Sequence, residues 1–220
     1  MARPPRAAAA TNSNVFINCP FDDDYLPCFE ALLFAITVSG YRVRCALEDN
    51  DAEDIRFEKL KRLIRESDHT IHDLCRVELN QENLPRFNMP FELGLMMGAK
   101  SYGSPAQRRK RACIMIAAQF ALPASLSDLA GNDPAHHDND PAKVIAIVRD
   151  FLHRDPDERL LPGAEAFVRV FQIFKRDLPD LAQRARLAVP RDTHARLAYR
   201  NYMVLLQGFC DSIKGLEDIL

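Results

Sequence analysis

The sequence predicts an α/β protein: a flavodoxin-like, short parallel sheet of four or five strands flanked by helices, with a C-terminal helical extension. Two observations lead to this class. In the first two thirds of the chain, short runs rich in β-formers alternate with longer segments of helical periodicity, as in βαβ units with parallel strands. Beyond residue 155 only helical patterns occur.

The first elements form a βαβ unit. Residues 15–19 (VFINC) are an apolar run that Pro20 ends, which predicts a strand. From Pro27, apolar residues recur at helical spacing up to Gly40, where a helix C-cap is expected. Residues 41–47 (YRVRCAL) predict the second strand.

The alternation continues along the chain. After an acidic loop at 48–54, we expect a helix over 57–64, a short strand over 69–74, a helix over 90–100, a buried strand over 112–117 and a helix over 141–152. Residues 119–140 are rich in proline, glycine and asparagine and predict mostly loop, without a convincing fifth strand.

The chain divides into three parts. Residues 1–14 predict a disordered tail whose alanine run is too short for a signal peptide or a membrane span. Residues 15–153 are the α/β domain, and residues 154–220 are the helical extension. An apolar stripe from Tyr199 to Ile213 packs back onto the domain or forms the interface of a homodimer or higher oligomer.

Composition limits the partners. The net charge is -2 and the pI about 6.3, so we expect no nucleic-acid partner, and no segment suggests a membrane partner. Six cysteines without a C-x-x-C pair predict free thiols and a cytoplasmic location. The basic run 108–111 is a solvated loop or a phosphate-binding patch. No motif suggests a cofactor.

Chemistry is expected where the strands end. In alternating β/α sheets, ligands bind in the crevice outside the carboxyl ends of the strands, here the loops 20–25, 48–54 and 73–90. Asp73 ends the third strand and could place a carboxylate in this crevice, although a turn-forming Asx residue explains it equally well. Paired carboxylates serve glycosidic chemistry, so a second one nearby is of interest.

Glu92 is the candidate second carboxylate. It stands near the start of its predicted helix, where the helix dipole and free N–H groups stabilise an ionised carboxylate, as a nucleophile requires. Ordinary helix-end electrostatics is the other interpretation. Gly94 and Gly98 lie four residues apart in the same helix, at a cost of about 1 kcal/mol each, which indicates close approach of a ligand or a backbone.

A metal site is not predicted. His69 and His72 point to opposite faces of a strand. His136, His137 and Asp138 could ligate a metal, but no further ligand stands at a spacing typical of a metal site, and such loop histidines are usually exposed.

Two motifs border the predicted crevice, residues 16–21 (FINCPF) and residues 88–100 (NMPFELGLMMGAK). They resemble the nucleoside 2-deoxyribosyltransferase family and its wider relatives, the TIR-like nucleotide glycosidases, over about Val15 to Ala117. The resemblance implies that Glu92 attacks the anomeric carbon of a nucleoside-like substrate and that Asp73 orients Glu92 or the sugar. It also implies that Phe21 packs against the base. The other residues expected around the substrate at these motifs are Pro20, Asp22, Asn88 and Gly94.

The chain departs from this family before Glu92. The deoxyribosyltransferases carry an acidic residue there that reads the nucleobase, whereas this chain has Pro85, Arg86 and Phe87. Arg86, Arg56 or Arg76 would instead favour a phosphorylated substrate such as a nucleotide or NAD, because guanidinium groups bind phosphate bidentately.

The leading expectation is an N-glycosidase that acts on a nucleotide, nucleoside or NAD by hydrolysis or transfer, and the resemblance suggests bacterial antiviral defence. One alternative is a non-catalytic nucleotide-sensing module of the same fold. Another is a receiver-like domain in which Asp22, Asp23, Asp24 and Asp73 hold Mg²⁺, although the lysine that should end a fifth strand is missing.

Overall fold

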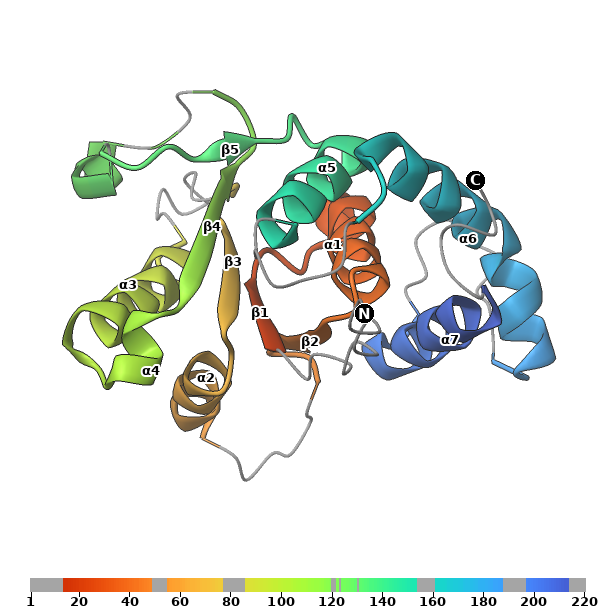
Figure 1. Ribbon diagram of the computed structural model, residues 1–220, viewed down its shortest axis with the longest axis horizontal. Helices are drawn as coiled ribbons and strands as arrows, with labels where there is room; N and C mark the ends of the chain where they lie inside the picture. The colour runs from red at the N-terminus through yellow and green to blue at the C-terminus, as the bar shows by residue number, and fades with distance from the viewer. Residues whose placement is uncertain are drawn as a thin grey trace, which may run out of the picture.

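A computed structural model describes most of the chain and confirms the α/β class. It covers residues 14–48, 55–76, 86–119, 122, 124–129, 131–153, 161–187 and 197–213. Nearly all of the predicted tail and most of the acidic loop lie outside these ranges. Five parallel strands form one sheet in the order β2-β1-β3-β4-β5, which is the flavodoxin-like order (Figure 1).

The strands are short, and four of them lie close to where the sequence predicts them. They are β1 (Asn14–Asn18), β2 (Arg42–Cys45), β3 (His69–Asp73), β4 (Arg111–Ile116) and β5 (Ala135–His136). The inner strand β1 pairs with β2 through Val15 and Val43 and with β3 through Val15 and His69. Their carboxyl ends meet at one edge of the sheet, called the carboxyl edge below.

The loop predicted over 119–140 contains structure that the sequence does not indicate. A 3-10 helix, η2 (Ala124–Leu129), interrupts it, and β5 then pairs with the end of β4 through Met115–Ala135 and Ile116–His136. The expectation of no fifth strand was therefore wrong. A strand of two residues is too short to show alternation in the sequence.

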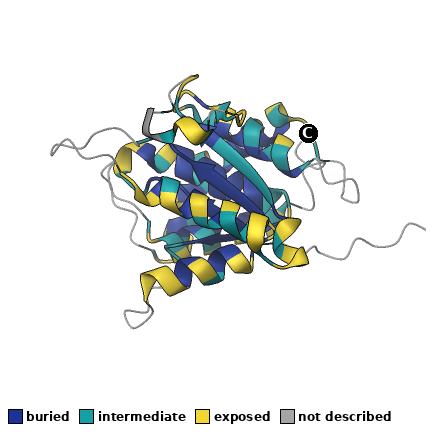
Figure 2. Ribbon diagram, turned by 90° about the vertical axis from the view of Figure 1, so that its left-hand side faces the viewer, coloured by how far each residue is buried: buried dark blue, intermediate teal, exposed yellow. Residues whose placement is uncertain are grey.

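Helices cover both faces of the sheet. On one face lie α1 (Leu26–Val38) and α5 (Pro141–Leu152); on the other lie α2 (Arg56–Arg65), α3 (Asn88–Tyr102) and the short α4 (Pro105–Arg108) (Figure 1). Successive side chains of β1 point to opposite faces of the sheet, so this strand contributes to the core on both faces. Val15 and Ile17 pack in the core with α1 and α5, whereas Phe16 packs in the core with α2 and α3. Viewed from the α2–α3 side, exposed residues follow the outer helix faces above a buried sheet (Figure 2).

The C-terminal helices α6 (Ala164–Arg184) and α7 (Tyr199–Ser212) pack outside α1 and α5. The Phe34 ring of α1 lies 5.1 Å from Phe171, and Phe174 lies 5.1 Å from Phe209 of α7, between ring centroids. The apolar stripe that suggested an oligomer interface is thus occupied within the chain, because Tyr202 and Phe209 are buried in this core.

The basic run before β4 is only partly a solvated loop. Lys110 is buried and its Nζ donates to the carbonyl oxygens of Arg65, at 3.1 Å, and Ser67. Arg111 donates to the Phe151 carbonyl at 2.9 Å and its guanidinium covers the Phe151 ring. These two cations therefore join the end of α2 and the end of α5 to the sheet.

All six cysteines are free thiols, as expected. Among the helices of the described residues, none is both long and apolar enough to cross a membrane.

Phe174→Ala tests whether the C-terminal helices share the core of the sheet. Phe174 is fully buried between α1 and α7, so its truncation should lower the free energy of unfolding by about 3–5 kcal/mol. Val204→Ala, at an exposed position of α7, is the matched control and should change it by less than about 0.5 kcal/mol. Urea denaturation followed by circular dichroism gives both values; equal effects would contradict a shared core.

Candidate functional site

The start of α3 is fastened to the carboxyl edge by Asn18, the last residue of β1. Its Nδ2 donates to the Met89 carbonyl at 2.8 Å and lies 3.0 Å from Nδ1 of His72. Burial lowers the pKa of His72 to about 3, so the ring is neutral and Nδ1 can accept this hydrogen bond. The first turn of α3 is thereby held against the ends of β1 and β3.

Glu92 lies one turn further along α3 and is 5% exposed. Burial raises its pKa to about 7, and the charge of Arg56, at the start of α2, opposes part of this rise. The expectation of a first-turn carboxylate stabilised in its ionised form was wrong, because α3 begins at Asn88 and Glu92 is beyond the free N–H groups. Desolvation therefore outweighs the helix dipole.

Glu92 and Asp73 belong to the same region of the carboxyl edge. Burial raises the pKa of the Cys19 thiol well above its usual value, and the negative charges of Asp73 and Glu92 raise it further. Cys19 directly follows β1, so both carboxylates lie within electrostatic range of the carboxyl end of β1.

Asp73 has no exposed surface and makes internal bonds only. Its Oδ2 accepts from the Tyr25 hydroxyl at 2.5 Å and lies 2.9 Å from Nε2 of His137, and its Oδ1 accepts from the Cys75 backbone N–H at 2.9 Å. Burial by itself would raise the pKa of Asp73, but His137, Tyr25 and the Cys75 N–H together lower it. The hydrogen bond from the Cys75 N–H to Oδ1 forms an Asx turn, which is the alternative role that the sequence allowed for Asp73.

His137 is the residue of this cluster that the sequence analysis misjudged. It is fully buried rather than exposed, because β5 pairs with β4 and its own N–H donates to the Ile116 carbonyl. The Asn139 N–H donates to Nδ1 at 3.1 Å, so the ring proton resides on Nε2, which faces Asp73. Asp138 and Asn139 have positive φ angles of 51° and 55°, which turn the chain at this point.

The same cluster contains three potential metal ligands. Donor atoms of Asp73, Cys75 and His137 all lie within 4.8 Å of one another, and their chemistry is that of a zinc site. The oxygens of Asp73 are, however, already engaged by Tyr25, Cys75 and His137, and burial raises the pKa of the Cys75 thiol, which keeps it protonated. The hydrogen-bond network accounts for the geometry of these residues without a metal.

A second cluster surrounds Asp22 at the rim of the carboxyl edge. Asp22 caps the 3-10 helix η1 (Asp23–Tyr25) by accepting from the Tyr25 N–H at 3.1 Å. Its oxygens also pair with Arg86 at 3.4 Å and Arg76 at 3.7 Å. The Mg²⁺ pocket of a receiver domain is therefore not formed, because Asp22 pairs with arginines and Asp73 faces inward.

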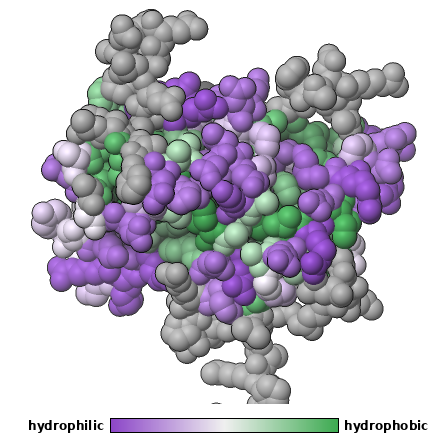
Figure 3. All heavy atoms as spheres, turned by 90° about the horizontal axis from the view of Figure 1, so that it is seen from above, coloured by the Kyte–Doolittle hydropathy of each residue, from purple (hydrophilic) through white to green (hydrophobic). Residues whose placement is uncertain are grey.

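The other predicted substrate residues are spread around this edge. Pro20 is buried after β1, Asn88 is exposed at the first position of α3, and Phe21 is half-buried with its ring against Phe29, 5.3 Å between centroids. Seen from the end where the strands finish, apolar atoms are visible at the centre of the surface, among hydrophilic side chains (Figure 3).

Gly94 and Gly98 do not mark a close approach within the chain. A Cβ at either position would meet no atom within 4 Å in the structure, and Gly94 is exposed. Of the two expected causes, a neighbouring backbone is therefore not observed at these glycines, and close approach of a ligand stays a prediction.

The geometry defines the class as an α/β protein with a buried, ionisable glutamate at the carboxyl edge. No protein-family model and no curated protein matches the chain. The fold and the residues of this edge therefore carry the functional argument.

Asp73→Asn tests the internal network. The amide cannot accept all the bonds of the carboxylate, so the free energy of unfolding at pH 7 should fall by about 3 kcal/mol or more. Because the pKa of Asp73 is lowered in the folded state, its stabilisation exists above the ordinary carboxyl pKa and is lost as the pH falls through the lowered one. Asp24→Asn, whose side chain is 86% exposed, is the matched control in urea denaturation and should change stability little.

Glu92→Gln should stabilise the protein, and more so at high pH. The folded-state pKa of about 7 exceeds the ordinary value of 4.5, so the native state is penalised as the pH rises between these values. The substitution should raise the free energy of unfolding by about 3 kcal/mol at pH 8 and by about 1 kcal/mol or less at pH 5. Thermal melts at both pH values measure this, and a gain independent of pH would show that Glu92 is not desolvated.

Proposed function

We propose that this chain cleaves the N-glycosidic bond of a nucleotide, nucleoside or NAD, with Glu92 as the nucleophile. The observation that carries the proposal is a buried carboxyl group with a pKa near 7 at the edge where sheets of this topology bind ligands. The resemblance of residues 16–21 and 88–100 to the deoxyribosyltransferases supports the choice of reaction.

The chemistry needs only groups that this edge offers. The Glu92 carboxylate would attack the anomeric carbon while the bond to the base nitrogen breaks and the base leaves with the bonding electrons. Nicotinamide would leave as a neutral molecule, whereas a purine or pyrimidine base would take up a proton from water. Water, or a second base in a transfer reaction, would then break the glycosyl ester and restore the carboxylate. The positive charge of Arg56 favours the ionised form of Glu92 that begins the cycle.

Arg76 and Arg86 support a phosphorylated substrate. Both guanidinium groups form ion pairs with Asp22, Arg86 at 3.4 Å and Arg76 at 3.7 Å, and both side chains are partly exposed. A phosphate could recruit them, because its charge and planar oxygen pairs match guanidinium better than one shared carboxylate does. Asp22 would hold both arginines in place until substrate arrives.

Asp73 would act as a positioning residue in this scheme. It makes no hydrogen bond to Glu92 in the described structure, and its bonds fix Tyr25 and His137 instead. This inward position also favours the alternative of a non-catalytic nucleotide-sensing module, since the crevice then holds one carboxylate rather than a pair. A cytoplasmic location and a role in bacterial antiviral defence belong to the proposal by resemblance only.

Release of free base tests the proposal. Purified wild type, Glu92→Gln and the control Glu165→Gln, at an exposed position in the first turn of α6, are incubated with NAD, nucleosides and nucleotides, and products are separated by chromatography. Wild type and control should release base, and Glu92→Gln should be slower by about a thousandfold or more. Equal release by Glu92→Gln would remove Glu92 from the mechanism. Nucleotide binding without release by wild type would favour the sensor.

The pH profile of the same assay distinguishes a nucleophile from an acid. A nucleophile must be ionised, so kcat/KM should rise with pH through about 7 and then level off. A fall in kcat/KM over the same range would instead assign Glu92 the role of a proton donor.

A further inference from the structure

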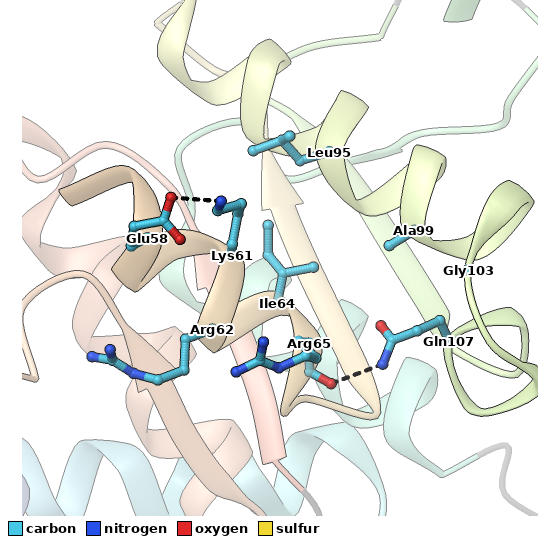
Figure 4. A pocket seen from close by; sticks show the side chains of 9 residues that line it. All are labelled: Glu58, Lys61, Arg62, Ile64, Arg65, Leu95, Ala99, Gly103 and Gln107. Carbon is cyan, nitrogen blue, oxygen red and sulfur yellow. Dashed lines mark hydrogen bonds and ion pairs between the residues drawn. The ribbon is translucent and has the colours of Figure 1, made fainter. Parts of the chain in front are cut away.

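A cavity lies between α2 and α3, away from Asp73 and Asp22, and α4 closes one end of it (Figure 4). Its volume is about 520 Å³, which is within the range of pockets for small organic ligands. Its lining residues belong to α2, α3 and α4, apart from Gly103, which lies between α3 and α4. We call it the α2–α3 groove.

The floor of the groove is apolar and its rim is cationic. Ile64, Leu95 and Ala99 supply the apolar surface between the two helices (Figure 4). The charged lining residues are three cations, Lys61, Arg62 and Arg65, and a single anion, Glu58. The protein as a whole has a net charge of -2, so this excess of positive charge is local to the groove.

Two of the rim cations, Lys61 and Arg65, are available to a ligand. Lys61 pairs with Glu58 at 2.6 Å, but both side chains are about half exposed, and such surface pairs contribute little. The exposed Arg65 side chain forms no hydrogen bond or ion pair within the parts of the chain that the structure describes, whereas its carbonyl accepts from Gln107 at 3.0 Å.

Gln107 adds a hydrogen-bond acceptor without a partner. Its Nε2 donates to the Arg65 carbonyl, while its Oε1 is inaccessible to water, has no hydrogen-bond donor, and lies on the side of Ala99 (Figure 4). A side chain at Gly103 would collide with Gln107 and with the Ala99 carbonyl, so glycine there lets α4 close the groove. A buried acceptor without a donor is destabilising, and a ligand donor would satisfy it once the Gln107 side chain turns its oxygen towards the groove.

We propose that the α2–α3 groove binds a small organic anion with an apolar or aromatic body and an N–H or O–H donor. The anionic group pairs with Arg65 and Lys61, the body covers Ile64, Leu95 and Ala99, and the donor binds Oε1 of Gln107 after this side chain turns towards the groove. This binding site is independent of the proposed reaction at Glu92.

The dye 8-anilinonaphthalene-1-sulfonate is a suitable probe, because it combines an aromatic body, a sulfonate and an N–H donor. Its fluorescence should rise on titration into the protein and saturate as a single site. Ala99→Trp, which fills the groove, and Arg65→Glu, which reverses a rim charge, should each weaken binding by about tenfold or more. Arg169→Glu, the same charge change at an exposed position of α6, is the matched control and should bind as wild type does.

The neutral analogue N-phenyl-1-naphthylamine, which lacks the sulfonate, should bind about tenfold or more weaker than the dye. Circular dichroism melts show whether each variant is folded, and Lys61→Glu replaces either variant that is not. Unchanged dye affinity in the folded groove variants, or equal affinity for the neutral analogue, would overturn the proposal. Neither result depends on base release, so this test and that of Glu92 can fail separately.

Discussion

The arrangement of the carboxyl edge depends on the buried charge of Asp73. An ionised carboxylate inside a protein is costly unless polar partners replace its water. Here the Tyr25 hydroxyl and the Cys75 N–H donate hydrogen bonds, and Nε2 of His137 lies 2.9 Å away as an ion-pair partner. These partners belong to η1, to the residues after β3 and to the residues after β5. One side chain thereby joins three segments, of which η1 also carries Asp22 and the arginines that it holds.

The two carboxyl groups of this edge differ because their surroundings differ. Asp73 has three polar partners, Tyr25, His137 and the Cys75 N–H, that lower its pKa. Burial raises the pKa of Glu92, and only the charge of Arg56 opposes this rise. Environments that separate two carboxyl groups in this way commonly give them separate tasks. Here the anchored group organises the scaffold, and the desolvated group is the one that we propose as the nucleophile.

Periodicity predicted the elements that are long or uniformly buried, such as β1, β4 and α1, because burial on a regular backbone leaves a pattern in the sequence. It failed for β5 and His137, since two residues leave no pattern and their burial follows from pairing with β4. It also misjudged Glu92. Because α3 starts two residues earlier than expected, Glu92 lies beyond the free N–H groups of the first turn, and its burial raises its pKa.

The position of α1 affects how the chain can be synthesised. This helix is apolar almost all round, and eight of its residues are buried between the sheet and the layer formed by α5, α6 and α7. Folding during translation begins at the N-terminus, yet the helices that complete the cover of α1 leave the ribosome only after the strands. A nascent chain that has already formed β1 to β4 therefore still presents an uncovered apolar surface, of the kind that chaperones bind, until α7 is released.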